Sequence, residues 1–321
     1  MSKLALKVQE LTKVFLGNFS LRNFKRNGEV VAVNEVSFGV GEGEVVGLLG
    51  PNGAGKTTTI QMLLGALTPT KGRIEYLGKN FTGINDPVLD QVNSVSSYAD
   101  LPQRMTVWEN LDVYGRIFGV KNRGERIKKL LTSFEVGELM DRRINTLSAG
   151  QKTRILMVKA MINYPRVLLL DEPTASLDPD IAMVVRKFLK VQQEKYGVAM
   201  LFTSHNMREV EEMCDRIVFL KKGKVVAEDT PKGLIKRLKG VRVRLLFETG
   251  SELAEKYFNE KYGRDKWFLD KDRYEVQLNE HEVARLLNGL SRRGVKYDEI
   301  EVVKPTLEDY FLEMSGDRGQ K

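Results

Sequence analysis

The feature that most constrains this chain is the segment VVGLLGPNGAGKTT at residues 45–58, where an apolar run, a glycine-rich turn and a helical pattern follow one another directly. The apolar run, residues 45–49, predicts a buried strand. The turn has the spacing of a P-loop, with Gly50 followed after four residues by Gly-Lys-Thr at 55–57. Glycines lack a Cβ atom, so the backbone of such a turn can curl around phosphates and point N–H groups at them. The segment therefore predicts a phosphate site at the end of a buried strand.

Two side chains in this segment have predicted roles of their own. We expect Lys56 to place its ammonium group on the β- and γ-phosphates of a nucleotide, and the Thr57 hydroxyl to ligate Mg²⁺. The helix that starts here adds the positive end of its dipole. The alternative, a glycine-rich turn that ends by chance in Lys-Thr, is disfavoured by the strand before it and the apolar helix after it. The residues expected to bind phosphate are Gly50, Pro51, Asn52, Gly53, Ala54, Gly55, Lys56, Thr57 and Thr58.

A second apolar run, VLLLDEP at residues 167–173, ends in two carboxylates. Four consecutive apolar residues predict a strand buried on both faces, as in the centre of a parallel sheet. Ligands of such sheets bind at the carboxyl ends of the strands, where Asp171 and Glu172 would lie. We expect Asp171 to hold Mg²⁺ through water, and Glu172 to be the general base that polarises the attacking water. Together with the P-loop, this run predicts an enzyme that hydrolyses a nucleoside triphosphate.

The length predicts two domains, and the composition is that of an ordinary soluble protein. Of the 321 residues, 42% are hydrophobic and 29% are charged, and no apolar stretch is long enough to span a membrane. The N-terminus lacks the pattern of a signal peptide, and the single cysteine, Cys214, predicts a reducing cytosol and a small buried side chain. The net charge is +8, and the excess of basic residues lies entirely in the first 239 residues. It would suit a nucleic acid or an anionic membrane, although dispersed solvating side chains explain most of it.

The order of predicted elements indicates the domains. Strands and helices alternate before and after a helical insert, which predicts an α/β nucleotide-binding domain with a mixed or parallel sheet at residues 1–239 and a helical subdomain at about 85–165. Within the insert, Thr106 and Glu109 predict a capping box at the start of a helix whose apolar face includes Ile117. Residues 240–321 follow the order β-α-β-β-α-β, which predicts a small ferredoxin-like α+β domain.

Three further motifs resemble those of the ATP-binding cassette ATPases, the ATPase subunits of ABC transporters. LSAGQ at 147–151 is similar to the signature of that family, usually LSGGQ. Ala-Ser-Leu-Asp at 175–178 is similar to its D-loop, and Ser204-His205 resembles its switch histidine. With the P-loop and VLLLDEP, five motifs stand in the family's order over residues 4 to about 235.

The resemblance implies a site that one chain cannot complete. In the family, two cassettes pack head to tail, and each ATP lies between the P-loop of one cassette and the signature of the other. Ser148 and Gly150 would then bind the γ-phosphate across the dimer, and His205 would contact the same phosphate within its own chain. Alternatively, Ser148 is an ordinary helix cap, and both roles can hold. The other residues that the resemblance assigns to nucleotide binding are Ala149, Gln151, Asp178 and the adenine-stacking Phe15.

Three positions depart from the family pattern. Ala149 stands where glycine is usual, and we expect a small effect. A polar, basic interruption at 16–29 separates Phe15 from the P-loop, so Phe19 or Phe24 could stack on adenine instead. The family's glutamine, which contacts Mg²⁺ and the attacking water, is replaced by Ser97 at the position reached by counting back from the next helix. The nearby Gln103 is the alternative metal-site residue.

The segment Lys-Pro-Thr-Leu-Glu-Asp-Tyr-Phe at 304–311 resembles the C-terminal motif of cassettes that serve multidrug, polysaccharide and related exporters. Those cassettes carry a C-terminal α+β domain. Together with the five motifs, this resemblance implies the ATP- and Mg²⁺-dependent ATPase subunit of an exporter, on the cytoplasmic face of the cell membrane. Its partners would be a second copy or a homologous cassette, and a separate permease seated near 97–110.

The alternative is a permease-free cassette ATPase acting on nucleic acid or ribosomes. We do not expect nucleic acid as a partner, because the chain has one nucleotide domain and its insert of about 80 residues lacks sustained heptads. A pure ATP sensor without turnover is a weaker alternative. The transported substrate is not predicted, since selectivity would lie in the permease.

Overall fold

The computed structural model describes residues 3–16, 19–20, 25–26, 28–96, 101–238 and 240–315. Contacts divide the chain into two units, Met1–Pro231 and Lys232–Lys321. The division falls at the start of helix α7 (Pro231–Arg237), whereas the sequence placed the domain boundary after residue 239, because nearly all of α7 groups with the C-terminal unit.

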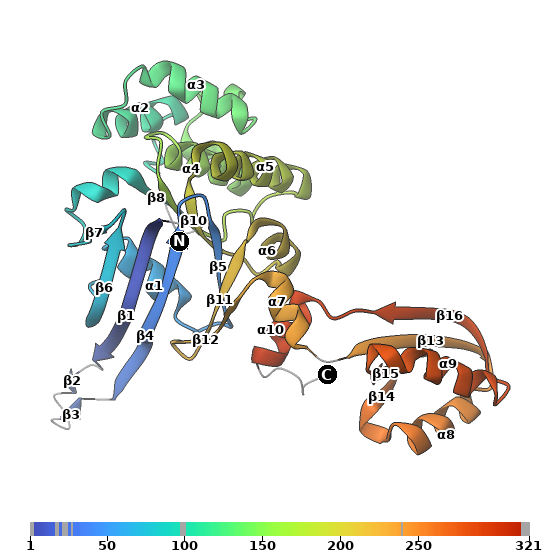
Figure 1. The fold of residues 1–321 in the computed structure, drawn as a ribbon. Helices are drawn as coiled ribbons and strands as arrows, with labels where there is room; N and C mark the ends of the chain where they lie inside the picture. The colour runs from blue at the N-terminus through green and yellow to red at the C-terminus, as the bar shows by residue number, and fades with distance from the viewer. Residues whose placement is uncertain are drawn as a thin grey trace. The chain divides into compact units, whose positions relative to one another are not determined.

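A six-stranded sheet forms the centre of the first unit (Figure 1). Its order is β12-β11-β5-β10-β9-β8, in which β12 is antiparallel to β11 and all other neighbours are parallel. Every residue of β5, β9 and β10 is buried, which explains why these strands are continuous apolar runs in the sequence. The strands are β5 (Val45–Leu49), β8 (Val92–Ser96), β9 (Val167–Asp171), β10 (Ala199–Thr203), β11 (Arg216–Lys221) and β12 (Lys224–Asp229).

A second, antiparallel sheet has the order β4-β1-β6-β7. One apolar cluster joins its buried side chains to those of the parallel sheet and of helix α1, so the two sheets and the P-loop helix share a core. Two short strands, β2 and β3, pair with each other in the interruption between β1 and β4. The elements are β1 (Leu4–Leu16), β2 (Phe19–Ser20), β3 (Lys25–Arg26), β4 (Glu29–Gly41), α1 (Lys56–Leu63), β6 (Lys71–Tyr76) and β7 (Lys79–Asn80).

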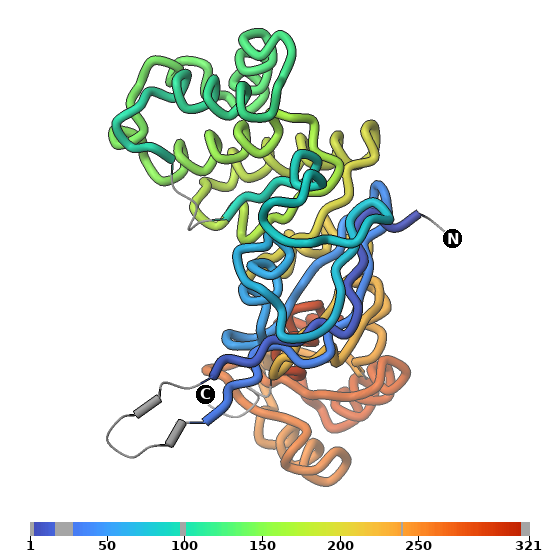
Figure 2. The backbone as a smooth tube through the Cα atoms, turned by 90° about the vertical axis from the view of Figure 1, so that its left-hand side faces the viewer, coloured from blue at the N-terminus to red at the C-terminus, as the bar shows by residue number. Residues whose placement is uncertain are grey.

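The helical subdomain contains the three predicted helices, α2 (Val107–Ile117), α3 (Arg123–Ser133) and α4 (Ala149–Ala160). Figures 1 and 2 place α2 and α3 at the end of this unit opposite to where β1 ends and β4 begins. The capping box at the start of α2 forms as expected, with Thr106 Oγ1 accepting the Glu109 N–H. Three short 3-10 helices complete this part of the chain: η1 (Pro87–Gln91), η2 (Gly137–Leu139) and η3 (Ile144–Thr146).

Two details of the insert differ from the prediction. The expected start at about residue 85 is too early, because β8 pairs in parallel with β9 and belongs to the sheet. Its sequence, VNSVS, holds only two apolar residues, so the strand was not visible as an apolar run. Ile117, expected on the buried face of α2, is 68% exposed, because the helix ends there and its last residue faces outward.

Helices α5 (Pro179–Tyr196) and α6 (Met207–Met213) follow β9 and β10 and lead to the next strands of the parallel sheet. Cys214, after α6, is buried as expected, and burial raises the pKa of its thiol. Its sulfur explains a glycine inside β5: a Cβ atom on Gly47 would lie 3.0 Å from Cys214 Sγ. The absence of a side chain at Gly47 therefore lets β5 and Cys214 pack closely.

The C-terminal unit has the predicted order β-α-β-β-α-β. Its antiparallel sheet has the order β14-β15-β13-β16, which is that of a ferredoxin-like domain. Its core combines aliphatic side chains with aromatic ones of α8 and of the sheet, including Phe258 and Trp267. The elements are β13 (Val241–Thr249), α8 (Ser251–Lys261), η4 (Arg264–Lys266), β14 (Trp267–Asp270), β15 (Arg273–Leu278), η5 (Glu280–Glu282), α9 (Val283–Ser291), β16 (Lys296–Val303) and α10 (Leu307–Ser315).

No helix in the described part of either unit is long and apolar enough to cross a membrane.

Candidate functional site

Three predicted motifs meet at one edge of the parallel sheet. The P-loop follows β5, Ser204-His205 follows β10, and Glu172 follows β9, and these three strands are neighbours in the order β5-β10-β9. Parallel strands end at the same edge of a sheet, so motifs far apart in the sequence form one pocket of about 350 Å³. Its lining consists of Ala32, Asn52, Gly53, Ala54, Gly55, Lys56, Thr57, Thr58, Asp171, Glu172 and His205.

The glycines of the P-loop serve different purposes. A Cβ atom on Gly50, whose φ is 149°, would lie 2.1 Å from the Leu220 carbonyl oxygen. One on Gly55, with φ of 102°, would lie 2.6 Å from the Ala32 carbonyl oxygen. Gly53 has a positive φ as well, but a Cβ atom there would meet nothing within 4 Å. The first two glycines are therefore required by the close approach of the protein's own backbone, and Gly53 only by its conformation.

The Lys56 ammonium lies against the loop that precedes it. Its Nζ donates to the carbonyl oxygens of Gly50, at 2.6 Å, and Pro51, at 3.1 Å. Burial lowers the pKa of Lys56, and the carboxylates of Glu172 and Asp171 act in the opposite direction by raising it. The cation is thus held inside the pocket, and charged phosphate oxygens are stronger acceptors than the two carbonyls that hold it now.

The first turn of α1 offers free polar groups to the pocket. Its N-cap, Gly55, is in the left-handed conformation and supplies no side-chain cap. The Thr57 hydroxyl has no hydrogen-bond partner within the described ranges, whereas the hydroxyl of Thr59, which is buried, donates to the Gly55 carbonyl oxygen. Uncapped N–H groups at a helix start are suited to an anion, and the Thr57 hydroxyl is available to a cation beside it.

Asp171 and Glu172 are held by a residue that the sequence reasoning missed. Thr203, the last residue of β10, pairs with Asp171 in register and donates its hydroxyl to Asp171 Oδ1 at 2.7 Å. The same Oγ1 accepts the Glu172 N–H at 3.1 Å. Thr203 is fully buried, and its hydroxyl orients both acidic residues from within the protein. Its position directly before Ser204-His205, at the end of an apolar run, was the available signal.

Two of the predicted catalytic side chains of this pocket, those of Glu172 and His205, contact one another. His205 Nε2 lies 2.7 Å from Glu172 Oε1. Glu172 has a φ of 52°, the left-handed region that non-glycine residues rarely adopt, and such strain is often found at functional sites. The chain turns sharply after β9, and this turn directs the carboxylate toward the histidine and the pocket.

The signature residues lie outside this pocket. Ser148 is the N-cap of α4 in a complete capping box: its Oγ accepts the Gln151 N–H at 3.2 Å, and Gln151 Oε1 accepts the Ser148 N–H at 3.0 Å. Ser148 and Ala149 are exposed, and neither lines the P-loop pocket. The predicted helix-cap role of Ser148 is therefore observed, and the P-loop of the same chain does not use the signature.

The signature and the helix that begins within it contact the D-loop instead. Thr153 of α4 and Ser176 share a hydrogen bond of 2.8 Å between their hydroxyls. A Cβ atom on Gly150 would lie 3.2 Å from the Ser176 carbonyl oxygen, so this glycine permits a close approach. Asp178, the last D-loop residue, is the exposed N-cap of α5 and makes no side-chain cap bond.

Several predicted contacts stay predictions. Ser97 and Phe24 lie outside the described residues, as does the side chain of Phe19. Gln103 is half-buried and its carbonyl oxygen accepts the Asn145 N–H, but it does not line the P-loop pocket. Phe15 is 42% exposed near the end of β1, with the Lys13 ammonium 5.4 Å from its ring centroid, and it does not line the pocket either.

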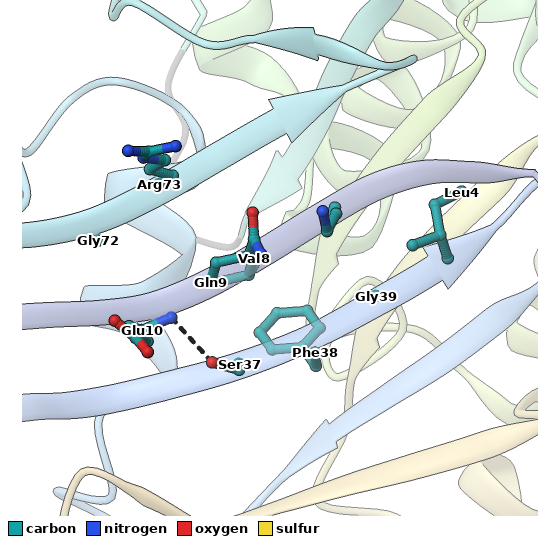
Figure 3. A pocket seen from close by; sticks show the side chains of 10 residues that line it. Leu4, Val8, Gln9, Glu10, Ser37, Phe38, Gly39, Gly72 and Arg73 are labelled. Carbon is teal, nitrogen blue, oxygen red and sulfur yellow. Dashed lines mark hydrogen bonds between the residues drawn. The ribbon is translucent and has the colours of Figure 1, made fainter.

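A larger pocket, of about 660 Å³, lies on the antiparallel sheet (Figure 3). It is lined by residues of β1, β4 and β6, and the Glu10 N–H donates there to Ser37 Oγ at 2.8 Å. Glu10 has a positive φ and marks a break in the register of β1 with β4. This hollow follows from an irregular strand, and no predicted site residue lines it.

Comparisons with known proteins agree with this geometry. A family model described as "ABC transporter" matches residues 33–175. The Nod factor export ATP-binding protein I of Rhizobium sp. (strain N33) is 33% identical over 331 residues, covering 100% of both chains. This chain belongs to the ATP-binding protein family of ABC transporters. It is an ATPase, the subunit of an ABC transporter that binds and hydrolyses ATP.

Solved structures of the family share its fold. The ATP-binding subunit of an ABC transporter is 26% identical, with a TM-score of 0.63, over 73% of this chain and 92% of that chain. A dimeric bacterial ABC transporter cassette is 25% identical, with a TM-score of 0.62, over 70% of this chain and 98% of that chain. The predicted cassette fold is confirmed.

Proposed function

We propose that this chain drives an exporter: ATP closes a dimer of cassettes, hydrolysis reopens it, and the movement is passed to a separate membrane permease. The observation that carries the proposal is the division of the site. The P-loop, both carboxylates and the switch histidine share one pocket, whereas Ser148 and Gly150 lie outside it and are free to meet the ATP of a second cassette. The dimeric state of a similar cassette supports this arrangement.

Export is proposed from the relatives. The Rhizobium protein that matches the whole length of this chain is named for the export of Nod factors, and the similarity includes the C-terminal unit. An ATP-binding subunit of an exporter works beside the permease that it drives. We therefore place this chain on the cytoplasmic face of a membrane, where ATP is supplied, with a second copy or a homologous cassette as its dimer partner.

The residues present fit a magnesium ion. Mg²⁺ prefers hard oxygen ligands and retains several waters. The Thr57 hydroxyl, which has no partner in the described part of the chain, and the Asp171 carboxylate, which Thr203 orients through one oxygen, offer such ligands at the edge of the P-loop. Bound there, the ion would neutralise phosphate charge. Ser97 or Gln103 remains the proposed third contact.

The protein groups would divide the reaction among them. Lys56 and the N–H groups at the start of α1 bind the phosphates and stabilise the charge that develops on them. Glu172 takes the proton of the attacking water as general base. His205, which already contacts Glu172, is placed to orient the γ-phosphate relative to that carboxylate.

The test is Glu172→Gln. An amide cannot accept the proton, so we expect ATP to be bound but turned over at least about 100-fold more slowly, and the closed dimer to accumulate. Phosphate release and size-exclusion chromatography with ATP measure the two effects. Glu138→Gln, at an exposed glutamate of η2, is the matched control and should behave as the unaltered protein. Unimpaired hydrolysis by Glu172→Gln would remove Glu172 from the mechanism, and a monomer at every ATP concentration would contradict the dimer.

A further inference from the structure

We infer that Glu209, a residue of α6 outside the five motifs, is a positioning residue that holds Glu172 and His205 in their places. The inference rests on the proposed roles of those two residues. Glu209 is only 4% exposed, and it does not line the P-loop pocket. A buried carboxylate is costly unless it is paired and hydrogen-bonded, so its partners indicate what it does.

The two oxygens of this carboxylate bind two different loops. Oε1 accepts a hydrogen bond of 2.6 Å from the Thr174 hydroxyl, and Oε2 accepts one of 2.7 Å from the Ser204 hydroxyl. Thr174 is two residues after Glu172, and Ser204 directly precedes His205. One side chain therefore fastens the loop that carries the general base to the loop that carries the switch histidine.

A cation from a third element completes this cluster. Arg186 of α5 places Nη1 3.5 Å from Glu209 Oε1, and its Nε lies 2.9 Å from Glu212 Oε2. Arg186 is itself largely buried, so it balances the charge of Glu209 in a region that excludes much of the water. Because the D-loop residue Asp178 is the N-cap of α5, the cluster also connects the helix after the D-loop to the two catalytic loops.

Thr203 and Glu209 hold different parts of this region. Thr203 holds the acidic residues at the ends of the strands, through Asp171 Oδ1 and the Glu172 N–H. Glu209 holds the residues that follow, where the chain has already left the sheet. The contact of 2.7 Å between His205 and Glu172 joins these two loops, so we expect it to depend on the Glu209 bonds. Glu209 touches neither catalytic side chain's reactive atoms and acts only through Thr174 and Ser204.

The experiment removes each bond separately in the full chain. Thr174→Val and Ser204→Ala delete one hydroxyl donor each with little change in volume. Glu209→Gln keeps the shape, but one of the two oxygens becomes an NH2 group, which cannot accept the hydrogen bond that Thr174 or Ser204 donates there. We expect each variant to lower kcat about fivefold to twentyfold while KM for ATP stays within about twofold, because positioning rather than binding is lost.

Two readouts separate this role from simple support of the fold. In the Glu209→Gln background, Ser204→Ala and Thr174→Val should cause little further loss, because they act through the same carboxylate. Hydrogen exchange at residues 172–178 and 203–207 should quicken in both segments with Glu209→Gln. Glu212→Gln, which shares Arg186 but is 57% exposed and contacts neither loop, is the matched control and should leave kcat and exchange unchanged.

Independent, multiplicative losses, or an equal loss in Glu212→Gln, would overturn the inference, as would unaltered exchange in both loops. Failure of the proposed function gives a different result. If Glu172→Gln hydrolyses ATP at the unaltered rate, the catalytic assignment fails, and hydrogen exchange alone then tests the role of Glu209. Faster exchange in both loops of Glu209→Gln supports the inference that Glu209 holds them, and unchanged exchange in both refutes it.

Discussion

The starts of α1 and α4 are both predicted to bind phosphate, yet they are built in opposite ways. The start of α1 is capped by Gly55 in a left-handed conformation, with no side chain supplying a cap bond. The start of α4 has a complete capping box between Ser148 and Gln151. The first helix leaves its N–H groups unsatisfied for an anion, whereas the second satisfies its own and is stable before any ligand arrives.

This difference fits the two halves of a shared site. The P-loop is backed by the sheet and shaped by close backbone approaches, so an incomplete helix cap is tolerated there. Ser148 and Ala149 of the signature are exposed and lie outside the pocket of their own chain, where an uncapped helix would fray. In the proposed dimer, the P-loop would therefore be the permanent half of the site, and the signature would be the half that is used on closure.

Gly50→Ala is expected to have the largest effect, and it tests whether close backbone packing shapes the P-loop. Its Cβ atom would lie 2.1 Å from the Leu220 carbonyl oxygen at a positive φ, so we expect ATP binding to be lost and the free energy of unfolding to fall by about 3 kcal/mol or more. Gly53→Ala is the control, because its Cβ atom would meet open space, and it should cost about 1 kcal/mol. Urea unfolding and nucleotide-binding titrations measure both. Equal losses would show that packing does not distinguish the two glycines.

Substitutions of Ser148 sharpen the comparison at the other helix. Ser148→Asp keeps an N-cap side chain but brings a negative charge to the proposed γ-phosphate site, so stability should hold while hydrolysis falls about 100-fold. Ser148→Ala removes the cap and one phosphate contact, and should cost about 1 kcal/mol of stability and about tenfold in hydrolysis. Thermal melts and phosphate release, at a protein concentration that allows dimers, measure these effects. Full activity in Ser148→Asp would show that Ser148 caps the helix and does not bind the γ-phosphate.

The smallest effect is expected from Ala149→Gly, which restores the glycine usual in the family signature. Ala149 is exposed at the first position of α4, so its methyl group contributes little to the core of this chain. We expect hydrolysis to stay within about twofold, with a loss of helix stability of at most about 1 kcal/mol. A tenfold gain in hydrolysis would show that the methyl group hinders the closed dimer.

Much of the fold could be predicted because its signals are local. The apolar runs of β5 and β9, the capping box of α2 and the order of elements after Gly240 each depend on neighbouring residues, and the structure contains all of them. β8 was missed because its two valines stand among polar residues, and only its pairing with β9 makes it a strand of the sheet. Local pattern does not report a partner strand.

By itself, the sequence determined the family and the cassette fold, and it predicted which residues carry the chemistry: the P-loop with Lys56 and Thr57, the pair Asp171 and Glu172, and the signature at 147–151. Only the tertiary structure decided how they are held. Thr203 orients the acidic pair, and Glu209 fastens the loops beside them, through bonds that join different strands and helices. The physical reason is that a motif records the groups a ligand must meet, whereas the contacts that position those groups come from residues far apart in the chain, whose proximity exists only after folding.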